Sequence, residues 1–364
     1  MDRKAFFARA CVVGLLFATG LAHAQQRGAT KFGVYADDDG TLVLSPAVTV
    51  SGTPVEGATV GASYLADIVS ASSTDLVSAA TKHFEERRDD VSGNLSYTTR
   101  SYLTLGGAFD WSRETDYRSY TPSAFVAKEL FDRNLTLSAA YAVSLNTVGR
   151  SGDPGFSEAM TNHSVTLSGS QVLSPDTVLG LTWQGQFARG FQASVYRYAS
   201  VYQLGSLAFQ TPEVVPDARD RHAAAVNLHH HLTGPIYLHG DYRLYLDDWG
   251  LLGHTVSGQL FYEISKDLFV RFGERAHWQT GADFYARRYE TRLRYMTSDK
   301  ELSPLWSVTT GVKIDYLWRS GAGALLSGLG INAKVDFIHV SYAEFEPLDA
   351  LNAWVGELGT SVTF

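Results

Sequence analysis

The sequence has one cysteine, no apolar run that could cross a membrane as a helix, and no excess of basic residues. Cys11 lies among the first 24 residues, so the rest of the chain can form neither disulfides nor thiolate metal sites. After Leu21, no stretch reaches the roughly 18 consecutive apolar residues of a transmembrane helix. The formal net charge of −8 argues against a nucleic-acid partner. Helical membrane proteins and basic nucleic-acid binders are thereby excluded.

The first 24 residues have the pattern of a secretory signal peptide. Basic residues near the start precede an apolar core over 11–21, and Ala22-His23-Ala24 forms a small-x-small cleavage site. We expect residues 1–24 to be removed and residues 25–364 to form a single domain. Cleavage would remove three basic residues and one acidic residue, which changes the net charge from −8 to −10.

Alternation of apolar and polar residues recurs along nearly the whole chain, which contains 19 Phe, 19 Tyr and 7 Trp. Segment 305–318 carries its apolar residues on one face of a strand, with Trp306 and Trp318 at the two ends of an aliphatic stripe. An exported, aromatic-rich β protein is either a soluble periplasmic sandwich or propeller, or an outer-membrane barrel. Aromatic residues at both ends of the stripe match the two interfacial girdles of a barrel, so they favour the membrane.

The connections between alternating segments give a second argument. Most odd-numbered connections are long and most even-numbered ones are short, as in barrels with periplasmic turns and extracellular loops. The pattern predicts an all-β, transmembrane, antiparallel up-and-down barrel of about 16 strands in the bacterial outer membrane, with 14 strands as the alternative. The sixteen expected strands are 31–36, 41–52, 58–69, 85–99, 102–113, 121–130, 134–146, 161–173, 177–189, 220–232, 235–247, 253–265, 267–279, 304–318, 327–342 and 352–364.

The last residues, ELGTSVTF, form an alternating strand that ends on Phe364. An even strand count places both ends of the chain in the periplasm, where this strand would close the barrel against the first. A terminal aromatic residue after alternating apolar positions resembles the signal read by the outer-membrane barrel assembly machinery of Gram-negative bacteria. We therefore expect Phe364 to be an assembly signal and that machinery to be a partner.

Two stretches resemble an uncharacterised family of outer-membrane barrels, a domain of unknown function. In YLADIVSASSTDLVSAATKHFEERRDD (64–90) the matching positions are Asp67, Ser70-Ala71-Ser72, Asp75, Ser78-Ala79, Glu85 and Arg87. In SRETDYRSY (112–120) a Ser-x-Glu-x-Asp-Tyr-x-Ser pattern includes Glu114 and Asp116. The resemblance extends over most of residues 25–364 and is strong in the first third. It implies a barrel and its location, but no activity.

The charged residues of these two stretches are expected at neighbouring outer connections. They could form a substrate or cation site at the pore mouth, or a salt-bridged loop folded over the rim, since charges at strand ends often meet at little cost. The residues concerned are Asp67, Asp75, Glu85, Glu86, Arg87, Arg88, Glu114 and Asp116.

A histidine run at 229–231 gives a weak candidate for a metal site. Alternation places His229 and His231 in the lumen and His230 outside, and a turn at Gly234 would set His229 opposite His239. Imidazoles on paired strands can hold a transition metal. Neutral histidines in a wet lumen need no metal, however, and no second-shell carboxylate is assured. We expect no cofactor.

The segment YARRYETRLRY (285–295) is a basic cluster on an acidic chain. An outer loop with Arg287, Arg288, Arg292 and Arg294 could bind lipopolysaccharide phosphates, because guanidinium groups match phosphate geometry. Folded inward, the same loop would set the charge of the pore. We expect the loop to stay outside, in contact with membrane lipid and lipopolysaccharide.

These observations favour a passive or weakly selective channel for small polar solutes, porin-like in architecture. The alternative is a scaffolding barrel that partners another envelope protein, with loop 190–219 filling the lumen. A hydrolase is disfavoured: the sequence has no Gly-x-Ser-x-Gly motif and no recognisable His-Ser-Asn or Asp/His set, so we do not expect an enzyme.

Overall fold

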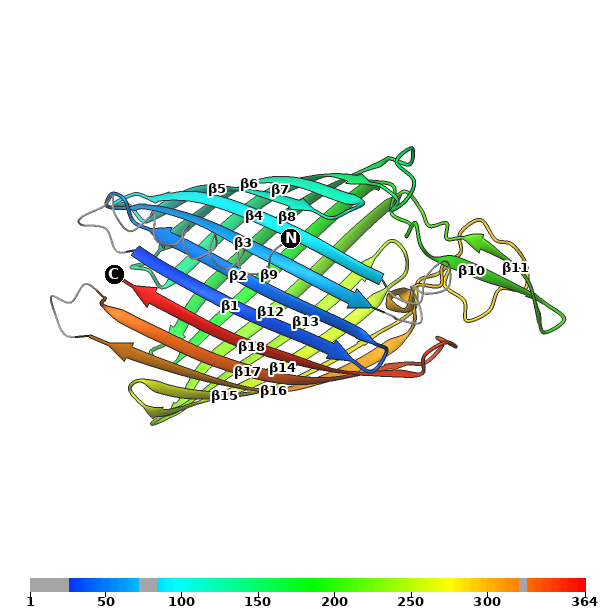
Figure 1. Ribbon diagram of the computed structural model, residues 1–364. Coiled ribbons are helices and arrows are strands. Elements are labelled where there is room, and N and C mark those ends of the chain that lie inside the picture. The colour runs from blue at the N-terminus through cyan, green and yellow to red at the C-terminus, as the bar shows by residue number, and fades with distance from the viewer. Residues whose placement is uncertain (1–25, 72–83, 321–325) are drawn as a thin grey trace, which may run out of the picture.

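The computed structural model describes residues 26–71, 84–320 and 326–364. Within these ranges the chain forms a closed antiparallel barrel of sixteen strands and a separate two-stranded sheet, β10–β11 (Figure 1). The strands are β1 (Gln26–Asp37), β2 (Thr41–Gly52), β3 (Ala58–Ala71), β4 (Phe84–Thr98), β5 (Leu103–Arg113), β6 (Tyr117–Leu130), β7 (Leu135–Val148), β8 (Glu158–Ser174), β9 (Thr177–Gly190), β10 (Tyr198–Gln203), β11 (Ser206–Pro212), β12 (Ala218–Thr233), β13 (Ile236–Asp247), β14 (Leu252–Ser265), β15 (Leu268–Gln279), β16 (Leu305–Arg319), β17 (Gly328–Tyr342) and β18 (Ala350–Thr363).

The predicted barrel and its larger strand number are confirmed. Each barrel strand pairs with its neighbour in the chain, except that β9 pairs with β12, and β18 closes the ring against β1. The closing register sets Phe32 opposite Leu358, and the backbone N–H of Phe364 donates to the carbonyl oxygen of Gln26 at 3.0 Å. Closure matters because it leaves no strand edge with unpaired backbone groups.

The outer face of the barrel is apolar. Its large hydrophobic side chains are exposed at alternate strand positions, as lipid-facing residues must be. Exposed aromatic residues form two belts. The belt near the longer loops contains Tyr120, Trp278, Trp306 and Trp354; the belt near the shorter turns contains Tyr97, Tyr262, Tyr316, Trp318 and Phe364.

The two ends of the barrel differ, as the connection lengths predict. We call the end with residue 26 and Phe364 the turn end. Its connections include 99–102, 131–134, 175–176 and 234–235. The opposite, loop end carries 149–157, 191–217 and 280–304. Among the described connections at this end, 38–40, 114–116 and 248–251 are short.

The hydrophobic core clusters of the described residues lie at the loop end. Segments 191–217 and 280–304, together called the cap, share one such core of Ala199, Val201, Tyr289 and Met296. Two isolated bridges, Val201 with Tyr289 and Val214 with Met296, join the segments. In Figure 1 the β10–β11 hairpin projects beyond the barrel. The hairpin was missed from the sequence, and this segment does not fill the lumen as the scaffold alternative supposed.

Helical structure is minor. The described ranges include a 3-10 helix, η2 (Lys300–Leu302), in the cap, with Asp299 accepting a hydrogen bond from the backbone N–H of Glu301. No helix in these ranges is long and apolar enough to span a membrane.

We expect the folded barrel to resist denaturing detergent at room temperature, because unfolding it requires the whole closed hydrogen-bonded ring to break. Unheated and boiled samples should therefore migrate differently on a denaturing gel. Near-ultraviolet circular dichroism supplies the control that the unheated sample is folded. Identical migration of a sample shown to be folded would contradict a closed barrel of this kind.

Candidate functional site

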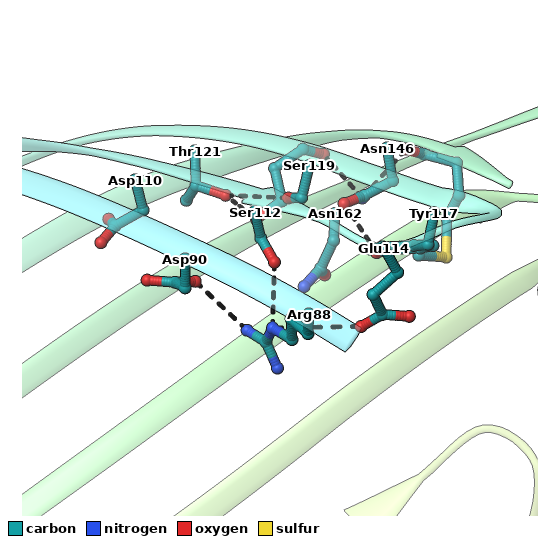
Figure 2. A pocket seen from close by; sticks show the side chains of 12 residues that line it. Arg88, Asp90, Asp110, Ser112, Glu114, Tyr117, Ser119, Thr121, Asn146 and Asn162 are labelled. Atoms are coloured by element: carbon teal, nitrogen blue, oxygen red, sulfur yellow. Dashed lines mark hydrogen bonds and ion pairs between the residues drawn. The ribbon is translucent and has the colours of Figure 1, made fainter. Parts of the chain in front are cut away.

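A polar hollow lies on the inner wall of β4 to β8, close to the loop end (Figure 2). Val91, Leu95 and Tyr97 of β4 are exposed on the outer face, so alternation directs Arg88 and Asp90 into the lumen. The hollow is lined by Arg88, Asp90, Asp110, Ser112, Glu114, Tyr117, Ser119, Thr121, Ser144, Asn146, Met160 and Asn162.

Arg88 organises the acidic side of this hollow. Its Nε donates to Ser112 Oγ at 2.9 Å, and its Nη2 lies 3.3 Å from Asp90 Oδ2. Nε is also 4.0 Å from Glu114 Oε1. One guanidinium therefore contacts groups on three sides, as the dashed lines of Figure 2 indicate. Asp110 has no ion-pair partner among the described residues, so the hollow as a whole keeps a negative charge.

Just beyond the hollow, three carboxylates converge. Glu86, Glu114 and Asp116 each place one carboxylate oxygen within 4.8 Å of an oxygen of the other two. Glu86 lies in the part of β4 that extends past its last pair with β5, Asp89 with Arg113, and hence beyond the aromatic belt. Oxygen-only sets of this kind suit hard cations such as Ca²⁺ or Mg²⁺.

Burial raises the pKa of Glu86 to about 7, and the neighbouring charges of Glu114 and Asp116 and a hydrogen bond with Asp116 act in the same direction. Glu86 Oε1 is buried and has no hydrogen-bond partner among the described atoms. Burial likewise raises the pKa of Glu114. At neutral pH the cluster therefore shares protons, which lowers its charge in the absence of a cation.

The cap is tied to this cluster by a chain of polar contacts that we call the mouth strap. Tyr196 of the cap donates from its hydroxyl to Asp116, and the same hydroxyl accepts from the backbone N–H of Ser151. The next residue, Arg197, pairs with Asp299 at 2.8 Å. Lys300 then lies 3.6 Å from Asp39 in the β1–β2 turn. The strap connects the β5–β6 connection with the β1–β2 turn by way of the cap.

The residues of the two predicted motifs do not form one cluster. Asp67 accepts from Ser45 Oγ at 2.6 Å. Arg87 faces outward, where it pairs with Asp89 at 2.7 Å and contacts Tyr64, so it does not line the lumen. Asp75 lies outside the described residues, and the structure gives only a strand position, in β4, for Glu85.

Of the motif residues, Glu114 and Asp116 do meet, but their partner is Glu86. Glu86 was grouped with them by its place in the sequence, not by the motif. Alternation along β4 indicates that Arg87 and Glu86 face opposite sides of the sheet. The apolar Val91, Leu95 and Tyr97 show that odd-numbered positions of this strand face outward.

The histidine run has the predicted register but not a metal-site arrangement. His229 pairs with His239, and their ring centroids are 3.9 Å apart. His231 instead lies 3.0 Å from Asp176 and contacts the carbonyl oxygen of Gly234. Across the described residues, the group of three or more potential ligands within reach of one ion is the carboxylate cluster.

The four arginines of the basic cluster lie in the cap and are exposed. Arg287 and Arg288 both pair with Glu346 of the β17–β18 connection, at 3.3 and 2.7 Å, and Arg288 also stacks over Tyr202 of the hairpin. Arg292 and Arg294 belong to the same segment. The segment packs against β10–β11, and its expected contact with lipopolysaccharide stays a prediction.

Fold and inner wall define a closed antiparallel barrel of the bacterial outer-membrane type. Residues 150–324 match the model of the family DUF3570, whose members are described as proteins of unknown function. This match confirms the resemblance to an uncharacterised family. The motif segments at 64–90 and 112–120 lie outside the matched residues. No curated protein matches the chain.

Solved structures are similar to this chain at low sequence identity. A bacterial polysaccharide outer membrane secretin has a TM-score of 0.51 and 10% identity, with 94% of this chain and 97% of that chain covered. OccK2 (OpdF) of Pseudomonas aeruginosa, solved with glucuronate, has a TM-score of 0.46 and 10% identity over 94% and 99% of the two chains. The siderophore receptor PirA of Pseudomonas aeruginosa has a TM-score of 0.43 and 14% identity; 86% of this chain covers 56% of the receptor.

Proposed function

We propose that the protein is an outer-membrane channel that passes small polar solutes passively or with weak selectivity. The observation that carries this proposal is the polar and charged inner face of a closed sixteen-strand ring. On β9, for example, Thr182, Gln184 and Gln186 alternate with the outward Leu181 and Trp183. A lipid-embedded barrel gains nothing from such a face unless water fills the lumen.

The size of the ring supports an aqueous path. Barrels of sixteen strands are wide enough to leave a channel where smaller barrels are filled by their own side chains. Hollows lie on opposite walls: one on β4 to β8, the other on β14 to β17. β5 and β15, which contribute to the two hollows, are eight places apart in the ring of sixteen.

The proposed orientation places the turn end in the periplasm and the loop end outside the cell. A cleaved leader at 1–24 would deliver the chain to the periplasm, and short turns at the periplasmic end are the rule for such barrels. The exposed arginines of the cap then lie at the height of lipopolysaccharide, whose phosphates they could contact.

Cysteine scanning tests the channel directly, because residues 25–364 contain no cysteine. Gln259 and Leu260 are adjacent on β14, with Gln259 toward the lumen and Leu260 exposed on the outer face. In a planar bilayer, the refolded Gln259→Cys variant should carry ion current that falls when a charged, water-soluble methanethiosulfonate is added.

Leu260→Cys is the matched control and should keep its current, because its thiol faces lipid. Equal responses of the two variants would contradict an aqueous lumen bounded by this face. Absence of current from folded wild-type protein would overturn the channel proposal.

A scaffolding role is the second candidate, supported by the β10–β11 hairpin. The hairpin projects beyond the barrel and exposes Leu204, Leu207 and Phe209. Large exposed apolar side chains on an ordered projection are typical of protein interaction sites. A folded protein that carries no current would favour this candidate.

A further inference from the structure

The hollow on β14 to β17 has a floor without side chains. Gly273 of β15 and Gly311 of β16 are direct partners in the register. Both face the lumen, because Phe272 on β15 and Val312 on β16, each one position away, are exposed on the outer face. Gly273 leaves room for a solute to approach the sheet, whereas the Asp336 carboxylate covers Gly311.

Four cationic side chains surround this floor. Arg271, Lys313 and Lys334 occupy one row across three strands, since Arg271 pairs with Lys313 and Lys313 pairs with Lys334. Arg275 lies on the other side of Gly273 along β15. All four line the same hollow. Alternation and the register of three consecutive strands, β15 to β17, bring them together.

The positive charge of this hollow is only partly neutralised. Lys313 pairs with Asp315 at 2.7 Å, and Lys334 pairs with Asp336, which lies over Gly311. The two arginines differ from the lysines. Arg271 donates to the neutral Gln259 Oε1 at 3.3 Å, and neither it nor Arg275 pairs with a carboxylate among the described residues. The Gly273 side of the floor therefore has two guanidinium groups without counter-ions.

We infer that this hollow is a binding site for the carboxylate groups of small solutes that pass through the lumen. Guanidinium groups bind carboxylates through paired, charge-assisted hydrogen bonds, which are about twice as strong as neutral ones. Gly273 leaves the space between Arg271 and Arg275 open, and Thr309 at the level of Arg275 offers a hydroxyl group, whereas the Ser257 hydroxyl at the same level donates to Asp241. Asp336 repels an anion from the Gly311 side and so restricts the site to the Gly273 side.

The inference rests on the proposed channel, because the solute reaches the hollow only through the lumen. It adds a substrate class, small organic acids, and a site on the inner wall where they bind transiently. A site of moderate affinity suits transport, since a solute must bind well enough to enter and weakly enough to leave.

Succinate is the probe for the test. In single-channel recordings, succinate should reduce the chloride-carried current of the wild type in a saturable manner. The Arg271→Gln/Arg275→Gln variant should need about 100-fold more succinate for the same reduction, roughly tenfold for each charge-assisted bond lost. Arg271→Lys/Arg275→Lys keeps the charge without the planar fork and should fall between the two.

Arg243→Gln is the matched control. It removes one lumen arginine on β13, outside this hollow, and should leave the succinate dependence within about threefold of the wild type. If Arg243→Gln and the double variant lose succinate sensitivity equally, lumen charge in general and not this hollow is responsible. Inorganic phosphate that matches succinate in every variant would overturn the carboxylate assignment.

Calorimetric titration of the refolded protein with succinate separates this inference from the channel proposal. If the wild type carries no current but shows a heat of succinate binding that the double variant lacks, the channel proposal is wrong and the binding site is supported. If the wild type carries current but binds no succinate by either method, the channel proposal is supported and the binding-site inference is wrong. Heat-modifiable migration of each variant verifies that it is folded.

Discussion

Replacing Glu86 with glutamine is expected to make the folded barrel more stable at pH 8 and less dependent on pH below that. The ordinary pKa of a glutamate is 4.5, and burial and the nearby Glu114 and Asp116 raise that of Glu86 to about 7 in the folded state. The folded protein therefore holds a proton that the unfolded chain releases between these values. Stability is lost as pH rises from about 4.5 through 7.

The loss for a fully buried group would be about 3 kcal/mol, and solvent near the half-buried Glu86 reduces this to about 1–2 kcal/mol. Glu86→Gln should recover that amount at pH 8 in urea unfolding followed by tryptophan fluorescence. In this variant the free energy of unfolding should still fall with rising pH, but less steeply, because the pKa values of Glu114 and Asp116 are also raised. Glu290→Gln, an exposed change in the cap, is the control. If the free energy of unfolding of Glu86→Gln depends on pH as strongly as that of the wild type, the three carboxylates do not share protons.

Replacing Glu213 with alanine should open the cap while the barrel stays folded. Glu213 is 7% exposed, joins β11 to β12, and accepts hydrogen bonds from the Thr297 hydroxyl and from the backbone N–H of Ser194 at 2.8 Å. Burial raises its pKa, and the two bonds oppose that effect. Thr297 is fully buried, so the variant leaves its hydroxyl without this acceptor.

Loss of hydrogen bonds to a buried charged group costs about 3 kcal/mol, which raises the open population of the cap by roughly 100-fold. Trypsin should cut after the exposed arginines of 285–295 faster by a factor of that order, while unheated samples keep their folded migration. Glu290→Ala in the same segment should be cut at the wild-type rate. Unfolding of the barrel together with the cap would show that the two are a single cooperative unit.

Acidic and basic groups gather on opposite sides of this barrel. Carboxylates gather on β4, β5 and the connection to β6, and arginines without counter-ions lie on β15, on the far side of the ring. In the proposed channel, a solute that enters past the mouth strap would meet the acidic group first and the basic hollow deeper. The net charge of the chain alone therefore would not fix the ion preference of the proposed channel, because the local arrangement of charge within a low-dielectric wall decides it.

The sequence by itself determined the barrel, its strand positions and much of its pairing. Alternation is a local property, and the two-residue turn at Gly234 fixes its own register, so His229 opposite His239 followed from neighbouring residues alone. The expected strand at 41–52 coincides with β2, and the expected 177–189 falls one residue short of β9. Alternation along each strand also determines which side chains face the lumen, and it places Arg87 on the outer face.

Only the tertiary structure decided the cap and the two clusters on the inner wall. The β10–β11 hairpin owes its place to contacts with 280–304, and its own short strands carry no long alternation. Glu86 meets Glu114 and Asp116 because the register of β4 and β5 leaves it past the end of their pairing. Arg271, Arg275, Lys313 and Lys334 gather around Gly273 and Gly311 because three strands align. Such groupings depend on which residues of separate strands lie side by side, and periodicity within one strand holds no information about that.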